Sequence, residues 1–125
     1  MPLPAVVIAE ENGVQTVAFT RDDRGVADQD RVRFFFSHEL LQQTSGWKRL
    51  VIDLSGVVTL DSASLGPLVQ KLREIQDLKG NLALAGVACP ALREIFALTR
   101  FDKVFAMYPT RAEAVAAVAL GSASV

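Results

Sequence analysis

The sequence has one cysteine, one histidine and no long apolar run among its 125 residues. A lone thiol, Cys89, cannot form a disulfide framework and fits a reducing compartment, where we expect a buried structural role for it. His38 lies mid-helix, and together these two residues cannot supply a familiar metal cluster. No apolar stretch approaches the roughly 20 residues that cross a bilayer, and the start, MPLPAVVIAEENG, lacks the basic region of a signal peptide. We therefore expect a soluble, cytoplasmic protein without a membrane span.

Motifs for nucleotide binding and acyl transfer are also missing. Gly56 and Gly66 match no phosphate-binding loop, and Ser62 does not stand in a Gly-x-Ser-x-Gly elbow. Asp53 and Asp61 could be imagined as paired carboxylates, but they belong to different segments. The sequence thus gives little support to an enzyme.

The charge balance argues against nucleic acid as a partner. Thirteen basic and fourteen acidic residues give a net charge of −1, whereas nucleic-acid surfaces show a strong basic excess. Half of the residues are hydrophobic, enough for a sizeable core. Length and composition predict one domain over residues 1–125.

The hydrophobic pattern predicts an α/β fold. Asn12-Gly13, between two β-rich runs of segment 5–20, indicates a hairpin, because both residues tolerate positive φ. Further on, apolar strands alternate with helices, as in parallel sheets joined by right-handed crossovers. The expected strands there are 49–54, 81–86 and 103–108, and the expected helices run from Asp28 to Ser45, through 65–79, and over 89–99 and 110–120. The prediction is a mixed sheet of four or five strands with about four helices.

The stretch DSASLGP marks the start of the second helix. Asp61, Ser62 and Ser64 are all good helix caps. Pro67 lacks an N–H, which is harmless only in a first turn, and this favours Ser64 as the cap. Ser62 would then face solvent on a loop. A phosphate there would meet the positive end of the helix and would repel an acidic or apolar partner. Capping and switching both stay open, and capping is the commoner role of such residues.

A long stretch resembles a known family. Residues 48–118, KRLVIDLSGVVTLDSASLGPLVQKLREIQDLKGNLALAGVACPALREIFALTRFDKVFAMYPTRAEAVAAV, resemble the STAS domain of bacterial anti-sigma factor antagonists. The shared features are an apolar strand ending in Asp-Leu, a short loop, Asp-Ser at a helix start, KGNLAL, and a helix ending LTRFDKVF. The resemblance implies the STAS fold over a single domain.

The resemblance also implies a function. In that family a partner serine kinase, which is also an anti-sigma factor, phosphorylates the Ser after the Asp, here Ser62. The unphosphorylated domain binds the kinase and so releases a sigma factor; phosphorylation ends binding, and a phosphatase restores it. The implied partner contacts are Asp61, Ser62, Ala63 and Ser64, with Asp28 from the segment 25–28 that matches the family's Gly-x-Leu-Asp. No catalysis and no cofactor are implied.

Some positions depart from the family pattern. The family continues Asp-Ser with Ser or Thr and then Gly, where this chain has Ala63 and Ser64, and Pro67 replaces an aliphatic residue. STAS domains also serve as scaffolds of stress-sensing complexes and as subunits of lipid-transport ABC assemblies. These alternatives stay open, and so does a homodimer.

The aromatic run Phe34-Phe35-Phe36 cannot face one side of a helix, because neighbours are about 100° apart. Phe35 and Phe36 align with Val32 and Leu40 and should lie in the core. Phe34 should point outward, where it could anchor a partner.

Overall fold

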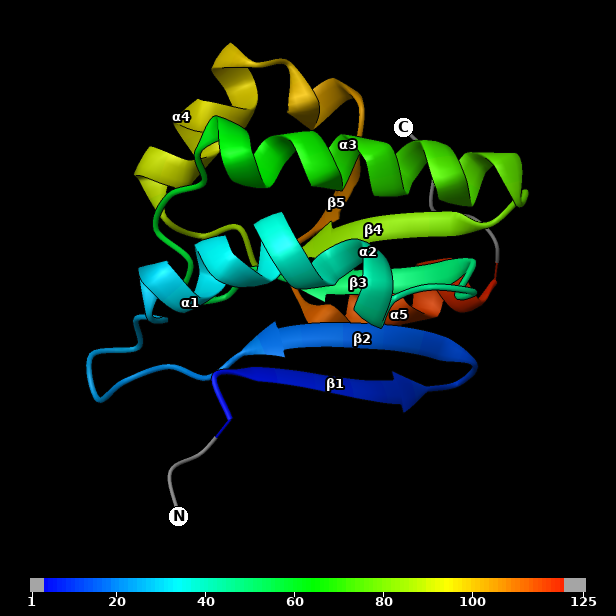
Figure 1. The fold of residues 1–125 in the computed structure, drawn as a ribbon, viewed down its shortest axis with the longest axis horizontal. Coiled ribbons are helices and arrows are strands. Elements are labelled where there is room, and N and C mark those ends of the chain that lie inside the picture. Colours follow the sequence, from blue (N-terminus) through cyan, green and yellow to red (C-terminus); the bar gives the residue numbers. More distant parts are fainter. Residues whose placement is uncertain (1–3, 121–125) are drawn as a thin grey trace.

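The computed structural model describes residues 4–120, and these build one five-stranded sheet (Figure 1). The strands are β1 (Val6–Glu11), β2 (Val14–Phe19), β3 (Arg49–Asp53), β4 (Asn81–Ala85) and β5 (Ala106–Tyr108). They lie side by side in chain order, with β1 antiparallel to β2 and all later pairs parallel.

The connections between the parallel strands are helical. The helices are α1 (Gln29–Phe34), η1 (Phe35–Glu39), α2 (Leu40–Gln43), α3 (Ser62–Asp77), α4 (Pro90–Leu98), η2 (Phe101–Lys103) and α5 (Arg111–Ala119). The segments α1, η1 and α2 form one helical unit without a break. Counted in that way, the α/β architecture agrees with the prediction of a mixed sheet and about four helices.

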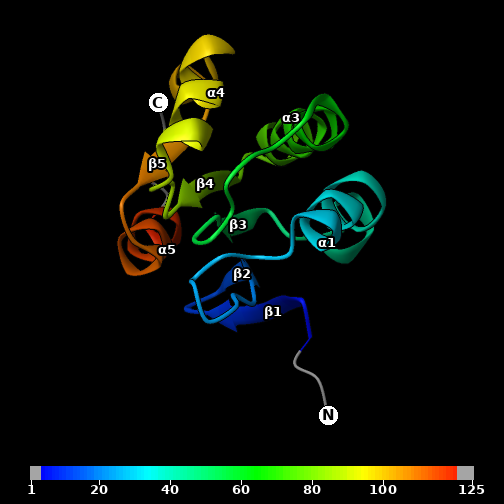
Figure 2. The ribbon, with the colours of Figure 1, turned by 90° about the vertical axis from the view of Figure 1, so that its left-hand side faces the viewer.

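The helices form a layer on each face of the sheet. Figure 2 shows α1 and α3 on one side of the strands and α5 on the other. The larger core lies under α1, α3 and α4, and a smaller one, built around Val14, Val51 and Val115, lies under α5. This double coverage explains why the central residues of β3, from Leu50 to Ile52, are apolar and buried on both faces rather than alternating.

The hairpin forms where the sequence predicts it. Asn12 and Gly13 join β1 to β2 with φ values of 54° and 80°. The last strand differs from the prediction of 103–108, because it begins only at Ala106. The N–H groups of Val104 and Phe105 both donate to the carbonyl of Phe101, and this tight turn takes up the segment before the strand.

The first helix departs from α-helical geometry at η1, a π-helical turn. The N–H of Leu40 donates to the carbonyl of Phe35, five residues earlier. Phe35 and Phe36 are 1% exposed and Leu40 is fully buried, whereas Phe34 is 46% exposed. The predicted division of the three phenylalanines is therefore confirmed, although the π turn was not predicted.

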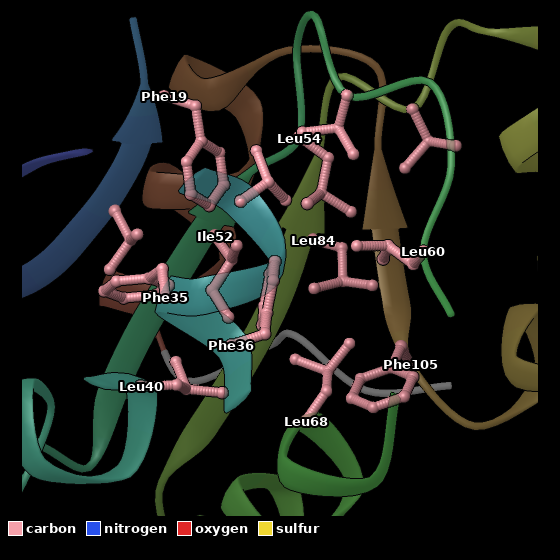
Figure 3. Close-up of a cluster of buried hydrophobic side chains, with 14 of the residues drawn as sticks. Phe19, Phe35, Phe36, Leu40, Ile52, Leu54, Leu60, Leu68, Leu84 and Phe105 are labelled. Carbon is pink, nitrogen blue, oxygen red and sulfur yellow. The ribbon is translucent and has the colours of Figure 1, made fainter. Parts of the chain in front are cut away.

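The buried phenylalanines join the helix to the sheet. Figure 3 shows Phe19 of β2 beside Phe35 and Phe36, with Ile52 and Leu84 of the central strands behind them. The ring of Phe19 lies 5.8 Å from those of both Phe35 and Phe36. This cluster fixes the helical unit on the sheet and, with it, the start of α1.

No helix within residues 4–120 combines the length and the apolar character needed to cross a membrane.

The two neighbouring phenylalanines provide a matched pair for testing the helix phase. Phe35→Ala should lower the free energy of unfolding by about 3–5 kcal/mol, because it leaves a cavity in the core. Phe34→Ala should lower it by less than about 1 kcal/mol, since that ring is half exposed. Urea unfolding of the two variants measures both values, and equal losses would contradict the observed orientation of the helix.

Candidate functional site

The candidate site lies at the edge of the sheet where the parallel strands end. In Figure 1, β2, β3 and β4 point to the side at which α1 and α3 begin. Ligands and partners of α/β domains commonly meet this edge, because loops and helix starts gather there. The predicted residues Asp28 and 61–64 stand at the beginnings of these two helices.

A compact loop positions the first helix start. The side chain of Asp22 accepts hydrogen bonds from the N–H groups of Val26 and Arg24, and the Val26 bond contributes most to lowering the pKa of Asp22. The turn is therefore favoured with Asp22 ionised, and that support is lost as pH falls through the lowered pKa. The N–H of Ala27 then donates to the carbonyl of Gly56 at 2.9 Å, which ties the loop to the β3–α3 connection.

Asp28 follows immediately and caps α1. Its Oδ1 accepts from the N–H groups of Asp30 and Arg31, at 3.0 and 3.3 Å. The residue is exposed. The start of α1 is therefore satisfied by a side chain that is also accessible to a partner.

Asp61, and not Ser64, caps α3. The Oδ1 of Asp61 accepts from the N–H of Ser64 at 3.0 Å, and the helix begins at Ser62. Ser64 is 1% exposed and lies inside the first turn. The prediction that Ser64 caps the helix is therefore wrong, and Ser62 lies in the first turn rather than on a loop.

A contact from the first helix explains how Pro67 is tolerated inside α3. Proline cannot donate to the carbonyl four residues earlier, which belongs to Ala63. The Oγ of Ser37 donates to that carbonyl at 3.4 Å. A side chain from η1 thus replaces the missing backbone donor. The helix α3 can therefore begin at Ser62, more than one turn before Pro67.

Ser62 and Ala63 present their side chains to solvent. Within residues 4–120, the hydroxyl of Ser62 has no hydrogen-bond partner. Its neighbours are both engaged: the side chain of Asp61 caps α3, and the carbonyl of Ala63 accepts from Ser37 of η1. The first turn of α3 is therefore held by its neighbours and leaves the hydroxyl of Ser62 accessible.

Arg33 connects the two helix starts through charge. Its Nε lies 3.3 Å from Oδ2 of Asp61, and its Nη2 lies 3.5 Å from Oδ1 of Asp30. Both ion pairs are at the surface, with 55% of the Arg33 side chain and 50% of the Asp61 side chain exposed.

A hollow of about 120 Å³ lies between the helix starts, lined in part by Arg33, Asp61 and Gln29. The Oε1 of Gln29 is buried and has no hydrogen-bond partner in the described part of the chain.

Other residues weighed from the sequence lie apart from this arrangement. Asp53 accepts from Ser55 and faces Arg111 of α5 at 3.7 Å, so it does not pair with Asp61. Cys89 is half-buried, with its Sγ 3.7 Å from the carbonyl of Val58. His38 is exposed, and its ring lies 4.9 Å from that of Phe34 at an angle of 45°. Among residues 4–120, no group of three or more His, Cys, Asp or Glu residues is placed to hold a metal ion.

Sequence reasoning missed Arg33 and Ser37. They stand four residues apart on the first helix, a spacing that puts two side chains on one face. That spacing could have suggested a shared neighbour, but several other charged residues of this segment show similar spacings. Only the placement of α3 beside η1 identifies these two as contacts of the site.

Comparisons of the sequence and of the structure with known proteins point to the same family. The family model described as STAS domain matches residues 29–114. An anti-sigma-factor antagonist (STAS) domain protein from Planctomyces limnophilus is 25% identical, with a TM-score of 0.68 over 91% of this chain and 97% of that chain. An anti-sigma factor antagonist from Mycobacterium paratuberculosis is 26% identical, with a TM-score of 0.63 over 90% of this chain and 92% of that one. A Thermotoga maritima protein at 22% identity and a TM-score of 0.65, covering 90% of this chain and 93% of its own, supports the fold alone.

Three substitutions test which residue caps α3. Asp61→Ala should lower the free energy of unfolding by about 1 kcal/mol, because the N–H of Ser64 loses its acceptor. Asp61→Asn keeps an acceptor and gives up only a surface ion pair, so it should cost a few tenths of a kcal/mol. Ser64→Ala should cost less than Asp61→Ala. Chemical denaturation measures all three, and a larger loss for Ser64→Ala would restore Ser64 as the cap.

Proposed function

This chain belongs to the STAS domain family, and on that premise we propose that it is an anti-sigma factor antagonist whose partner binding is switched by phosphorylation of Ser62. The partner is a serine kinase that also serves as the anti-sigma factor. In the unphosphorylated state the domain occupies this partner in the cytoplasm, and a sigma factor is released for transcription. A serine phosphatase returns the phosphorylated form to the binding state. The domain acts by binding and catalyses no reaction of its own.

The observation that carries the proposal is the hydroxyl of Ser62. It is exposed and hydrogen-bonded to nothing among residues 4–120, directly after the capping Asp61. A hydroxyl that caps a helix would be occupied by a backbone N–H, and its modification would disturb the fold. Because Asp61 performs the capping, Ser62 is available to accept the γ-phosphoryl group of ATP, with release of ADP and the hydroxyl proton.

The position at a helix start explains how a phosphate could change binding without unfolding the domain. The first N–H groups of a helix and its dipole favour a negative group by about 0.3–1 kcal/mol. In an interface, the same group of about −1.5 to −2 charges loses water unless the partner supplies new donors, and this costs several kcal/mol. Phosphorylation should therefore affect the complex far more than the fold.

The proposed contact surface combines both helix starts. Asp61, Ser62 and Ala63 are exposed at the start of α3, and Asp28 is exposed at the start of α1. Ser64 is buried. We assign Ser64 to shaping the turn that presents Ser62, while the other four residues contact the partner directly.

The similar proteins support this assignment. The Planctomyces limnophilus and Mycobacterium paratuberculosis proteins are both anti-sigma factor antagonists, and each aligns over nine tenths or more of its own chain. An anti-sigma factor is thus the partner class that the comparisons favour.

Ser62 is predicted to be the acceptor of phosphate. Incubation with the cognate kinase and ATP, followed by peptide mass spectrometry, should place a single phosphate on Ser62. Ser62→Ala should abolish incorporation, and Ser45→Ala, at an exposed serine just after α2, serves as the matched control that retains it. Phosphate on Ser64 alone, or none in the unmodified chain, would refute the assignment and leave a scaffold role for the domain.

Charge mimicry separates binding from folding. Ser62→Asp should change the free energy of unfolding by less than about 1 kcal/mol, since an acid is tolerated in the first turn. It should weaken partner binding by tenfold or more, which corresponds to about 1.4 kcal/mol. Ser62→Ala should retain binding. Calorimetric titration and thermal melts of both variants provide the comparison, and parallel losses in stability and affinity would instead make Ser62 a structural residue.

A further inference from the structure

Arg33 stands beside the proposed phosphorylation site, and its two ion pairs there are weak. Its guanidinium is shared between Asp61 of the α3 cap and Asp30 of its own helix, at 3.3 and 3.5 Å. More than half of its side chain is exposed, so water and salt screen both ion pairs. Exposed pairs of this kind contribute about 0–1 kcal/mol, so a stronger anion nearby would displace them.

We propose that Arg33 is the intramolecular receptor for a phosphate on Ser62: on phosphorylation its guanidinium moves from Asp61 to the phosphate. This inference rests on the proposed phosphorylation of Ser62. It assigns the regulation of that site to a residue on a different helix, which no sequence motif marks.

Reach and charge both favour this exchange. The Cα atoms of Asp61 and Ser62 are about 3.8 Å apart, as in any consecutive pair, and the arginine side chain is long enough to cover that shift. A phosphate carries about −1.5 to −2 charges against −1 for a carboxylate, and its oxygens match the planar fork of N–H donors on arginine. In competition for one guanidinium, the phosphate therefore prevails over Asp61.

The cap of α3 survives the exchange. Asp61 uses Oδ1 to accept from the N–H of Ser64 and Oδ2 to face Arg33. When the guanidinium of Arg33 leaves Oδ2, the hydrogen bond from the N–H of Ser64 to Oδ1 stays in place, so the start of α3 keeps its geometry. The phosphorylated form then differs in two ways: its phosphate is fixed against α1, and the Oδ2 of Asp61 loses its ion-pair partner at the proposed binding surface.

The test uses protein in which phosphoserine is incorporated at position 62 during translation, so it needs no kinase. The second pKa of the phosphate, near 6 for a free phosphoserine, is followed by phosphorus NMR across pH 4–8. A neighbouring guanidinium stabilises the dianion and lowers that pKa. Arg33→Gln should therefore raise it by about half a unit or more relative to the unsubstituted chain, whereas Arg33→Lys should raise it less.

Arg31→Gln is the matched control. Arg31 is on the same helix, but its guanidinium lies over the ring of Phe34, 5.6 Å from the centroid. This variant loses the same charge and should leave the phosphate pKa unchanged. In nitrogen–proton spectra, the Nε–H signal of Arg33 should shift on phosphorylation and that of Arg31 should not.

An identical phosphate titration for Arg33→Gln and the unsubstituted chain, or equal shifts for Arg33→Gln and Arg31→Gln, would overturn the proposal. Neither result bears on whether a kinase modifies Ser62, because the phosphate is installed independently. Conversely, a kinase that leaves Ser62 unmodified would refute the proposed function while the role of Arg33 as a phosphate receptor is measured separately.

Discussion

The carboxylate of Asp61 holds two helices at once, and the presentation of Ser62 depends on it. One oxygen accepts from the backbone of Ser64 and starts α3, and the other faces Arg33 of α1. A single side chain therefore sets both where α3 begins and how that start lies against the neighbouring helix. Because Asp61 fills the cap, the hydroxyl of Ser62 makes no hydrogen bond among residues 4–120 and is open to modification.

Polar contacts fasten the first helical unit to α3 along its length. Beyond the Arg33–Asp61 pair, Ser37 supplies the donor that Pro67 lacks. Further along α3, the fully buried amine of Lys71 donates to the carbonyl of Thr44 at 2.8 Å and pairs with Glu74. Burying a charged amine costs free energy unless the amine is paired. The hydrogen bond from Lys71 to the carbonyl of Thr44 therefore constrains how α3 aligns with the first helical unit. The apolar core fixes the helices on the sheet, and these contacts fix them relative to each other.

The sequence predicted the elements whose signals are local. The turn at Asn12-Gly13 depends on neighbours in the chain, and the outward direction of Phe34 follows from helical periodicity. Features that depend on distant contacts were missed or placed wrongly. The position of Pro67 led to the prediction that Ser64 caps α3. In the structure, Ser37 from another segment donates to the carbonyl of Ala63, which the proline leaves unpaired. The π turn of η1 and the role of Arg33 likewise follow from tertiary packing, which periodicity does not encode.

The starts of α1 and α3 are proposed to form the partner surface around Ser62. The most direct measurement is the change in backbone amide signals of the isotope-labelled, unphosphorylated domain on addition of unlabelled cognate anti-sigma factor. The strongest perturbations should fall on Asp28 and its neighbours and on residues 61–65. Perturbations confined to the end of α4 and the turn that follows it, around the exposed Leu98 and Val104, with residues 61–65 unchanged, would contradict this surface.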